Sequence, residues 1–132
     1  MSFVHVSAND SCRIFFNKQE IFNGEVEHET SVASIKSKTF TKSDCIRILY
    51  KSEHVAKGWE RIFYINAPEE RNLKTITIGQ QSGRASFTAT VLNAIKDKKQ
   101  PVLIYTISLP ADKAMAARIR VRRMFICKIE WN

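Results

Sequence analysis

The stretch Val102-Leu-Ile-Tyr-Thr-Ile-Ser-Leu109 decides the fold of this chain. Its β-branched and aromatic residues favour a strand. At its start, apolar residues occupy consecutive positions, which is typical of a strand that is covered on both faces. We therefore predict that residues 102–109 form a central strand and that the other elements are arranged around it.

The segments before this strand also predict β-structure. They alternate between apolar and polar residues or are rich in β-branched residues, and polar loops separate them. The clearest are residues 45–51, 59–66 and 73–78, which we expect to form an antiparallel meander. Nearer the N-terminus, short strands are predicted at residues 2–7, 12–16 and 25–29, with a turn at Asn23-Gly24 before the last of them.

Two segments predict helices. In residues 84–98, Phe87, Val91 and Ile95 recur at four-residue intervals, which is the spacing of one helix face. We expect this segment to be the principal helix. A short helix is predicted near residues 111–117, because a proline precedes a run rich in alanine, the strongest helix former.

From Arg118 to the end of the sequence the period returns to two. Apolar side chains fill the odd positions, whereas Arg118, Arg120 and Arg122 share the other face of a predicted last strand. The length of 132 residues and an ordinary composition indicate one compact domain over residues 1–132. The predicted fold class is α+β, with a mainly antiparallel sheet of about six or seven strands and one principal helix packed on it.

The least ordinary number is the formal net charge of +8. Residues 1–66 hold 9 basic and 8 acidic side chains, whereas residues 67–132 hold 12 basic and 5 acidic ones. On a strand, the three alternate arginines would lie about 6.6–7 Å apart, which is close to the phosphate spacing of a stretched single strand of nucleic acid. The predicted anion-binding residues are Arg118, Arg120, Arg122, Arg123, Lys113, Lys96, Lys98 and Lys99.

This basic patch allows three interpretations. The first is a small binding module whose arginines contact nucleic acid or another polyanion. The second is an adapter or inhibitor that binds an acidic protein surface. In the third, the arginines lie on a solvated strand face and pair with Glu25, Glu27 and Glu29 of the same chain.

A rival of another class is a small phosphodiesterase or ribonuclease. Glu53, His54 and Lys57 lie close together in one polar loop, and Arg61 follows them. A carboxylate, an imidazole and an ammonium group can share general acid–base work near neutral pH. Polar loops collect such residues without catalysis, so the sequence favours a binding module over an enzyme.

The remaining signals concern compartment and cofactors. Three cysteines without a CxxC pair indicate reduced, apolar residues rather than a metal or redox motif. No phosphate-binding or metalloenzyme motif appears, so no cofactor and no metal are expected. Without a secretory signal or an apolar run of membrane-spanning length, we expect a cytoplasmic protein with no membrane partner. Trp131 predicts a C-terminus tied into the core or into a subunit interface, which leaves homo-oligomers open.

Overall fold

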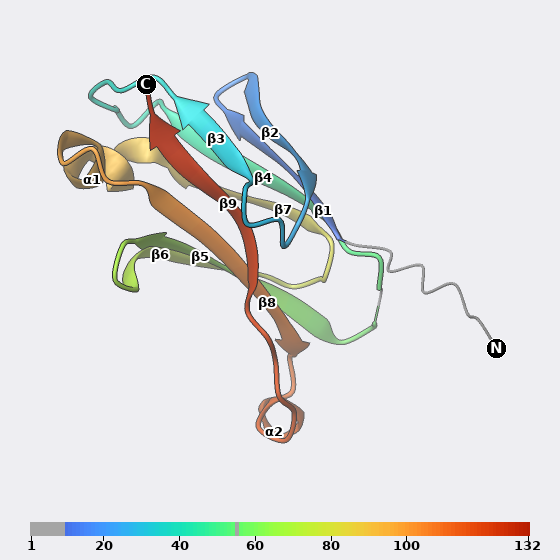
Figure 1. Cartoon of the computed structure of the whole chain (residues 1–132). Coiled ribbons are helices and arrows are strands. Elements are labelled where there is room, and N and C mark those ends of the chain that lie inside the picture. The colour runs from blue at the N-terminus through green and yellow to red at the C-terminus, as the bar shows by residue number, and fades with distance from the viewer. Residues whose placement is uncertain (1–9, 55) are drawn as a thin grey trace.

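The computed structural model describes residues 10–54 and 56–132, and over these residues nine strands form two facing sheets (Figure 1). The first sheet has the order β2-β1-β4-β7, and every neighbouring pair in it is antiparallel. Its strands are β1 (Ser11–Phe16), β2 (Gln19–Glu25), β4 (Cys45–Lys51) and β7 (Gly83–Thr88).

The second sheet has the order β3-β9-β8-β5-β6, and β8 is its middle strand. This confirms the prediction that the stretch beginning at Val102 is central. The pair β3–β9 is parallel and the other pairs are antiparallel. The strands are β3 (Val32–Ile35), β5 (Trp59–Ala67), β6 (Arg71–Ile78), β8 (Val102–Pro110) and β9 (Met124–Trp131).

The hydrophobic core fills the space between the sheets. Alternate residues of β4, Ile46 and Ile48, are fully buried and face Phe63 and Ile65 of the second sheet across one continuous cluster. The period of two predicted for these strands is therefore confirmed. A 3-10 helix, η1 (Ala89–Leu92), and the short helix α1 (Asn93–Asp97) follow β7 and contribute buried apolar side chains to the core.

The fold is broadly α+β, but the prediction of one sheet of about six or seven strands with a principal helix is wrong, because nine strands form two sheets over the described residues. Strand β4 pairs with β1 and β7, whereas β5 pairs with β8 and β6. The predicted meander therefore holds only for the β5–β6 hairpin. The loop of residues 52–58 is long enough to carry the chain from one sheet to the other, and strand periodicity alone does not distinguish such a crossing from a hairpin.

The predicted principal helix is also wrong. Residues 83–88 form β7, and Ala85 and Phe87 are buried as alternate residues of that strand. Phe87 belongs to both a four-residue and a two-residue pattern, and pairing with β4 decides between them. The helix near residue 111 is confirmed as α2 (Lys113–Ala116), whose N-terminus is capped by the side chain of Asp112.

Three boundaries differ from the sequence expectations. Asn23-Gly24 lies inside β2, and the turn before it is formed at Asn17, whose φ of 54° is a left-handed conformation that asparagine tolerates. Only Glu25 of residues 25–29 belongs to a strand. The last strand begins at Met124 rather than at Arg118, and the strand predicted at residues 2–7 lies outside the described residues.

Candidate functional site

The predicted basic residues do not form one patch. Lys96, Lys98 and Lys99 lie in or just after α1, whereas Lys113 and the four arginines follow the other end of β8 (Figure 1). A strand of this length, nine residues, separates its two ends by about 27 Å. Lys96 also pairs with Asp97 at 2.8 Å.

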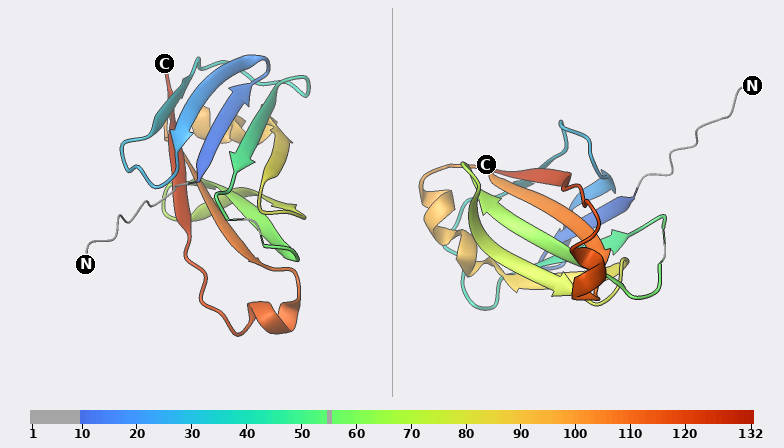
Figure 2. Two further views of the ribbon diagram at one scale, coloured as in Figure 1. Left: turned by 90° about the vertical axis from the view of Figure 1, so that its right-hand side faces the viewer. Right: turned by 90° about the horizontal axis from the view of Figure 1, so that it is seen from below.

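The chain between β8 and β9 forms a projection that we call the finger, residues 111–123. It extends away from both sheets (Figure 2), and each of its residues except Ala116 is exposed. Its base is fixed by the backbone N–H of Ala111, which donates to the carbonyl of Gly58 at 2.8 Å. Arg118, Arg120 and Arg122 therefore lie on an irregular projection instead of a sheet face, and the regular spacing of a strand does not apply to them.

Two of the four arginines are neutralised within the chain. Arg122 pairs with Glu27 at 2.8 Å, and Arg123 makes two hydrogen bonds with Glu70, at 2.5 and 2.9 Å. The guanidinium of Arg123 also lies over the ring of Tyr105, 3.8 Å from its centroid. Hydrogen bonding by Arg123 lowers the pKa of Glu70, and the same bonds raise the pKa of Arg123.

Arg118, Arg120 and Lys113 differ from these neighbours. In the part of the chain that the structure describes, none of the three makes an ion pair. The interpretation in which the arginines pair with glutamates of the same chain is therefore right for Arg122, which pairs with Glu27. Lys113, Arg118 and Arg120 keep an uncompensated charge toward the end of the finger.

The candidate acid–base residues lie on the loop between β4 and β5. Glu53, His54 and Lys57 are exposed, and within residues 10–54 and 56–132 no hydrogen bond or ion pair joins their side chains. Arg61 does not lie beside them on the surface, because it is 1% exposed and points into the interior. The geometry therefore does not assemble the acid–base set that phosphodiester cleavage needs.

Arg61 is instead the centre of a buried polar network. Its Nε donates to the carbonyl of Gln81 at 2.7 Å, and another nitrogen donates to Thr106 at 3.1 Å. Asp10 lies 3.6 Å away, and the guanidinium lies 3.9 Å from the centroid of the Tyr50 ring. Burial lowers the pKa of Arg61, although Tyr50 and Asp10 partly oppose that shift. The network fits a structural role, because a buried charge needs partners on every side.

Sequence reasoning missed a second group of cations, on the outer face of the first sheet. On β4, the half-buried side chain of Leu49 faces Arg13 of β1 on one side and Arg84 of β7 on the other. Arg47 and Lys51 occupy the positions two residues before and after it on the same face. Leu49 thus has a cationic residue on each of its four sides. We call Arg13, Arg47, Lys51 and Arg84 the cation cross.

The arms of the cation cross differ in their contacts. Arg13 pairs with Glu20 at 2.5 Å. The guanidinium carbons of Arg13 and Arg47 lie 5.0 and 5.2 Å from the centroid of the Phe15 ring. The Nε of Arg47 is buried and has no hydrogen-bond partner among the described residues. Arg47, Lys51 and Arg84 make no ion pair with any described residue, so three of the four charges are uncompensated.

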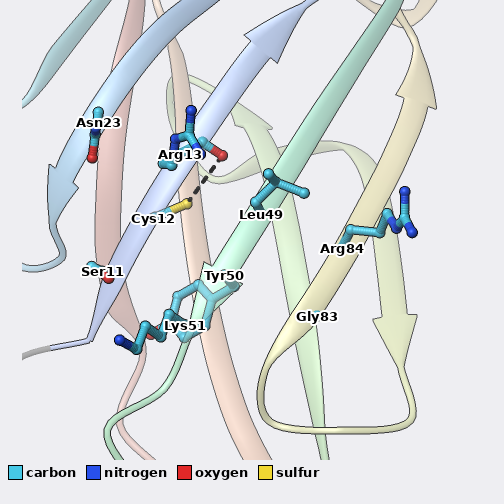
Figure 3. A pocket seen from close by; sticks show the side chains of 9 residues that line it. All are labelled: Ser11, Cys12, Arg13, Asn23, Leu49, Tyr50, Lys51, Gly83 and Arg84. Carbon is cyan, nitrogen blue, oxygen red and sulfur yellow. Dashed lines mark hydrogen bonds between the residues drawn. The ribbon is translucent and has the colours of Figure 1, made fainter.

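A hollow of about 550 Å³ lies at one end of the cation cross (Figure 3). Arg13 and Arg84 flank it, and Leu49 lies between them. The hollow also touches Cys12, but burial raises the pKa of that thiol to about 12. Cys12 therefore stays protonated at neutral pH and is a poor nucleophile. With Arg13, Lys51 and Arg84 in its lining, the hollow can bind anions.

The signal for the cation cross is present in the sequence but scattered. Arg47, Leu49 and Lys51 occupy the outward positions of a correctly predicted strand, and Arg13 has the same place in its own strand. Only the strand order, which places β1 and β7 on either side of β4, brings Arg13 and Arg84 beside them. A count of charge along the sequence therefore gives the most weight to the dense arginine run and little to these isolated residues.

Other kinds of site receive no support from the described residues. They contain no group of three or more His, Cys, Asp or Glu side chains placed to hold a metal ion. None of the helices among them has the length and apolar character needed to cross a bilayer. Comparison with models of protein families and with curated proteins finds no match to this chain.

Proposed function

We propose that this protein is a binding module for polyanions, and that the phosphate backbone of a single-stranded nucleic acid lies across the cation cross. The observation that carries the proposal is the placement of four cations around Leu49, only one of which has a carboxylate partner among the described residues. Phosphate contacts dominate sequence-independent affinity for nucleic acid, and arginine binds phosphate through two hydrogen bonds.

The dimensions of the sheet support this ligand. Arg47 and Lys51 are four residues apart on one strand, so their Cα atoms are about 13 Å apart. This is close to two phosphate steps of a stretched single strand, if stretching doubles the spacing of about 3.4 Å found in a duplex to about 6–7 Å. The guanidinium groups of Arg13 and Arg47, both next to Phe15, add planar surfaces on which unstacked bases can lie.

Fluorescence anisotropy with a labelled single-stranded oligonucleotide tests the proposal between about 50 and 200 mM salt. We expect binding that weakens as salt rises. The double variant Lys51→Gln/Arg84→Gln should bind more weakly, because two phosphates are no longer neutralised. The slope of log affinity against log salt should become shallower by about 1.4, or about 0.7 for each of these two phosphates.

The matched control is Lys42→Gln/Lys74→Gln, which removes the same charge from two exposed positions outside the cation cross. It should keep the wild-type slope. If both double variants bind the oligonucleotide equally weakly, only the net charge of the protein matters. That result would contradict the assignment of the site to the cation cross. If Arg118→Gln/Arg120→Gln weakens binding while the cation-cross variant does not, the site is the finger. If the wild type does not bind at either salt, the nucleic-acid function is wrong.

The apolar centre of the cation cross favours a second candidate, an acidic protein surface. Leu49 and Phe15 are half-buried, so a partner could cover them as well as pair with the cations. This alternative predicts that a purified acidic partner, once identified, competes with the oligonucleotide and binds less tightly to Leu49→Ser. An unchanged affinity in Leu49→Ser would leave only the charges and favour the polyanion.

A further inference from the structure

The finger exposes a concentration of apolar side chains. Met115 is 53% exposed, Val121 41% and Ile119 37%, and these are three of the four large hydrophobic residues found exposed among the described residues. All three lie within one short, projecting segment. Clustered exposed apolar side chains on a soluble domain typically mark an interaction site.

Cations are interleaved with these apolar residues. Lys113, Arg118 and Arg120 are exposed, and no acidic residue occurs from position 113 to position 123. The carboxylate of Asp112, which directly precedes these residues, accepts hydrogen bonds from the backbone N–H groups of Ala114 and Met115 and so is occupied in capping α2. The end of the finger is therefore both apolar and positively charged.

The shape of the finger restricts the kind of partner. It projects from the end of the sandwich (Figure 2), while Arg122 and Arg123 hold its base through Glu27 and Glu70. A protein that enclosed this projecting segment would need a matching cavity, whereas the headgroup layer of a membrane admits one without such a cavity. Because its base is fixed, the finger can contact a surface while both sheets stay away from that surface.

We propose that the finger binds the surface of an anionic membrane, with Met115, Ile119 and Val121 inserted at the level of the headgroups and the basic side chains against lipid phosphates and carboxylates. Apolar side chains combined with lysine and arginine are the chemistry of interfacial membrane binding. The expectation of no membrane partner rests on the lack of a spanning segment, which interfacial binding does not require.

The side-chain types of the finger suit a lipid surface. Its apolar residues are flexible or branched aliphatic ones, which can lie among lipid chains in several conformations. Each basic residue near an anionic leaflet raises affinity by about fivefold, so three of them give a substantial preference for anionic lipid.

Sedimentation with vesicles tests the proposal. The full chain should bind vesicles of mixed phosphatidylserine and phosphatidylcholine and should bind pure phosphatidylcholine much more weakly. Ile119→Ser/Val121→Ser should lower affinity for the mixed vesicles by about tenfold or more, because it removes apolar area from the inserted segment. Arg118→Gln/Arg120→Gln should lower it by about 25-fold.

The serine variant separates this proposal from the function of the cation cross. It should leave oligonucleotide binding unchanged, while Lys51→Gln/Arg84→Gln should keep most of the vesicle affinity. All changed residues are exposed, and a wild-type thermal midpoint confirms that each variant is folded. The proposal is overturned if the wild type does not bind the mixed vesicles, or if the serine variant binds them as the wild type does. A concentration-dependent dimer that the serine variant abolishes would instead assign the finger to a second copy of the chain.

Discussion

Arginine occurs in two opposite environments in this protein. Arg61 lies in the interior, whereas Arg118 and Arg120 lie on the exposed finger. Arg61 is 1% exposed, and its guanidinium is enclosed by Asp10, Tyr50 and hydrogen-bond acceptors. Arg118 and Arg120 are exposed and make no ion pair with a described residue. The contrast teaches that a formal charge predicts binding only when it is solvated and uncompensated, so the net +8 overstates what a partner would meet.

The largest effect on the free energy of unfolding is expected at the buried Arg61. Arg61→Ala should lower the free energy of unfolding by about 3–5 kcal/mol, because it leaves the Asp10 carboxylate without its cation and opens a cavity. Urea unfolding measures the change. Arg61→Met is the control, since it keeps much of the volume without burying a charge, and it should cost clearly less. Equal destabilisation by the two variants would mean that loss of the cation beside Asp10, and not loss of volume, explains the role of Arg61.

A smaller effect on the free energy of unfolding is expected at Tyr50, which contacts both Arg61 and Asp10. The hydroxyl of Tyr50 donates to Asp10 at 2.5 Å, and burial together with this hydrogen bond raises the pKa of Tyr50. Tyr50→Phe keeps the ring beneath Arg61 but removes the donor, so it should cost about 1–3 kcal/mol in urea unfolding. An unchanged stability would show that Arg61 and the backbone N–H of Glu53 alone satisfy Asp10.

The Glu70–Arg123 ion pair lies on the surface but each of its residues has a partner, and its contribution to stability should depend on pH. The pKa of Glu70 is lower in the folded protein than in the unfolded chain, so its contribution to stability is complete above about pH 4.3 and is lost as the pH falls through the folded value. Glu70→Gln should therefore melt below the wild type at neutral pH, and the difference should shrink in acid. A difference that stays constant with pH would contradict this origin.

The smallest effect on stability is expected for the exposed residues Arg118 and Arg120. Arg118→Gln/Arg120→Gln should change the free energy of unfolding by less than about 0.5 kcal/mol, because neither residue has an ion-pair partner among the described residues. Thermal unfolding beside the wild type checks this. A larger destabilisation would mean that the finger arginines support the fold, and any binding defect of this variant would need reinterpretation.

The sequence predicts individual strands better than their arrangement. Val102 to Leu109 forms the middle strand as expected, and the alternation of Ile46, Ile48 and Tyr50 gives the correct buried face. Which sheet a strand joins depends on pairing between distant segments. For that reason the predicted neighbours of β4 are wrong, and the residues of β7 are predicted as a helix.

The candidate site shows the same limit. The residue types in the finger can be read from the sequence, but their partners cannot, because Glu27 and Glu70 approach Arg122 and Arg123 only in the folded chain. The cation cross depends on strand order in the same way. Arg61 occupies an inward position of its strand, and the alternation of β5 already places it on the face of Phe63 and Ile65.

The parallel pair β3–β9 has a consequence for how the protein folds. Residues 32–35 pair with residues 128–131, so this ladder joins segments that most of the chain separates. Long-range pairing is slow, and we expect the local hairpins β1–β2 and β5–β6 to form well before it. Until the short β3 docks, residues 128–131 of β9, which include the buried Ile129, have no partner strand on that side. An unpaired apolar edge recruits other chains, so the last step of folding is also the step at which crowded, incompletely folded molecules would aggregate.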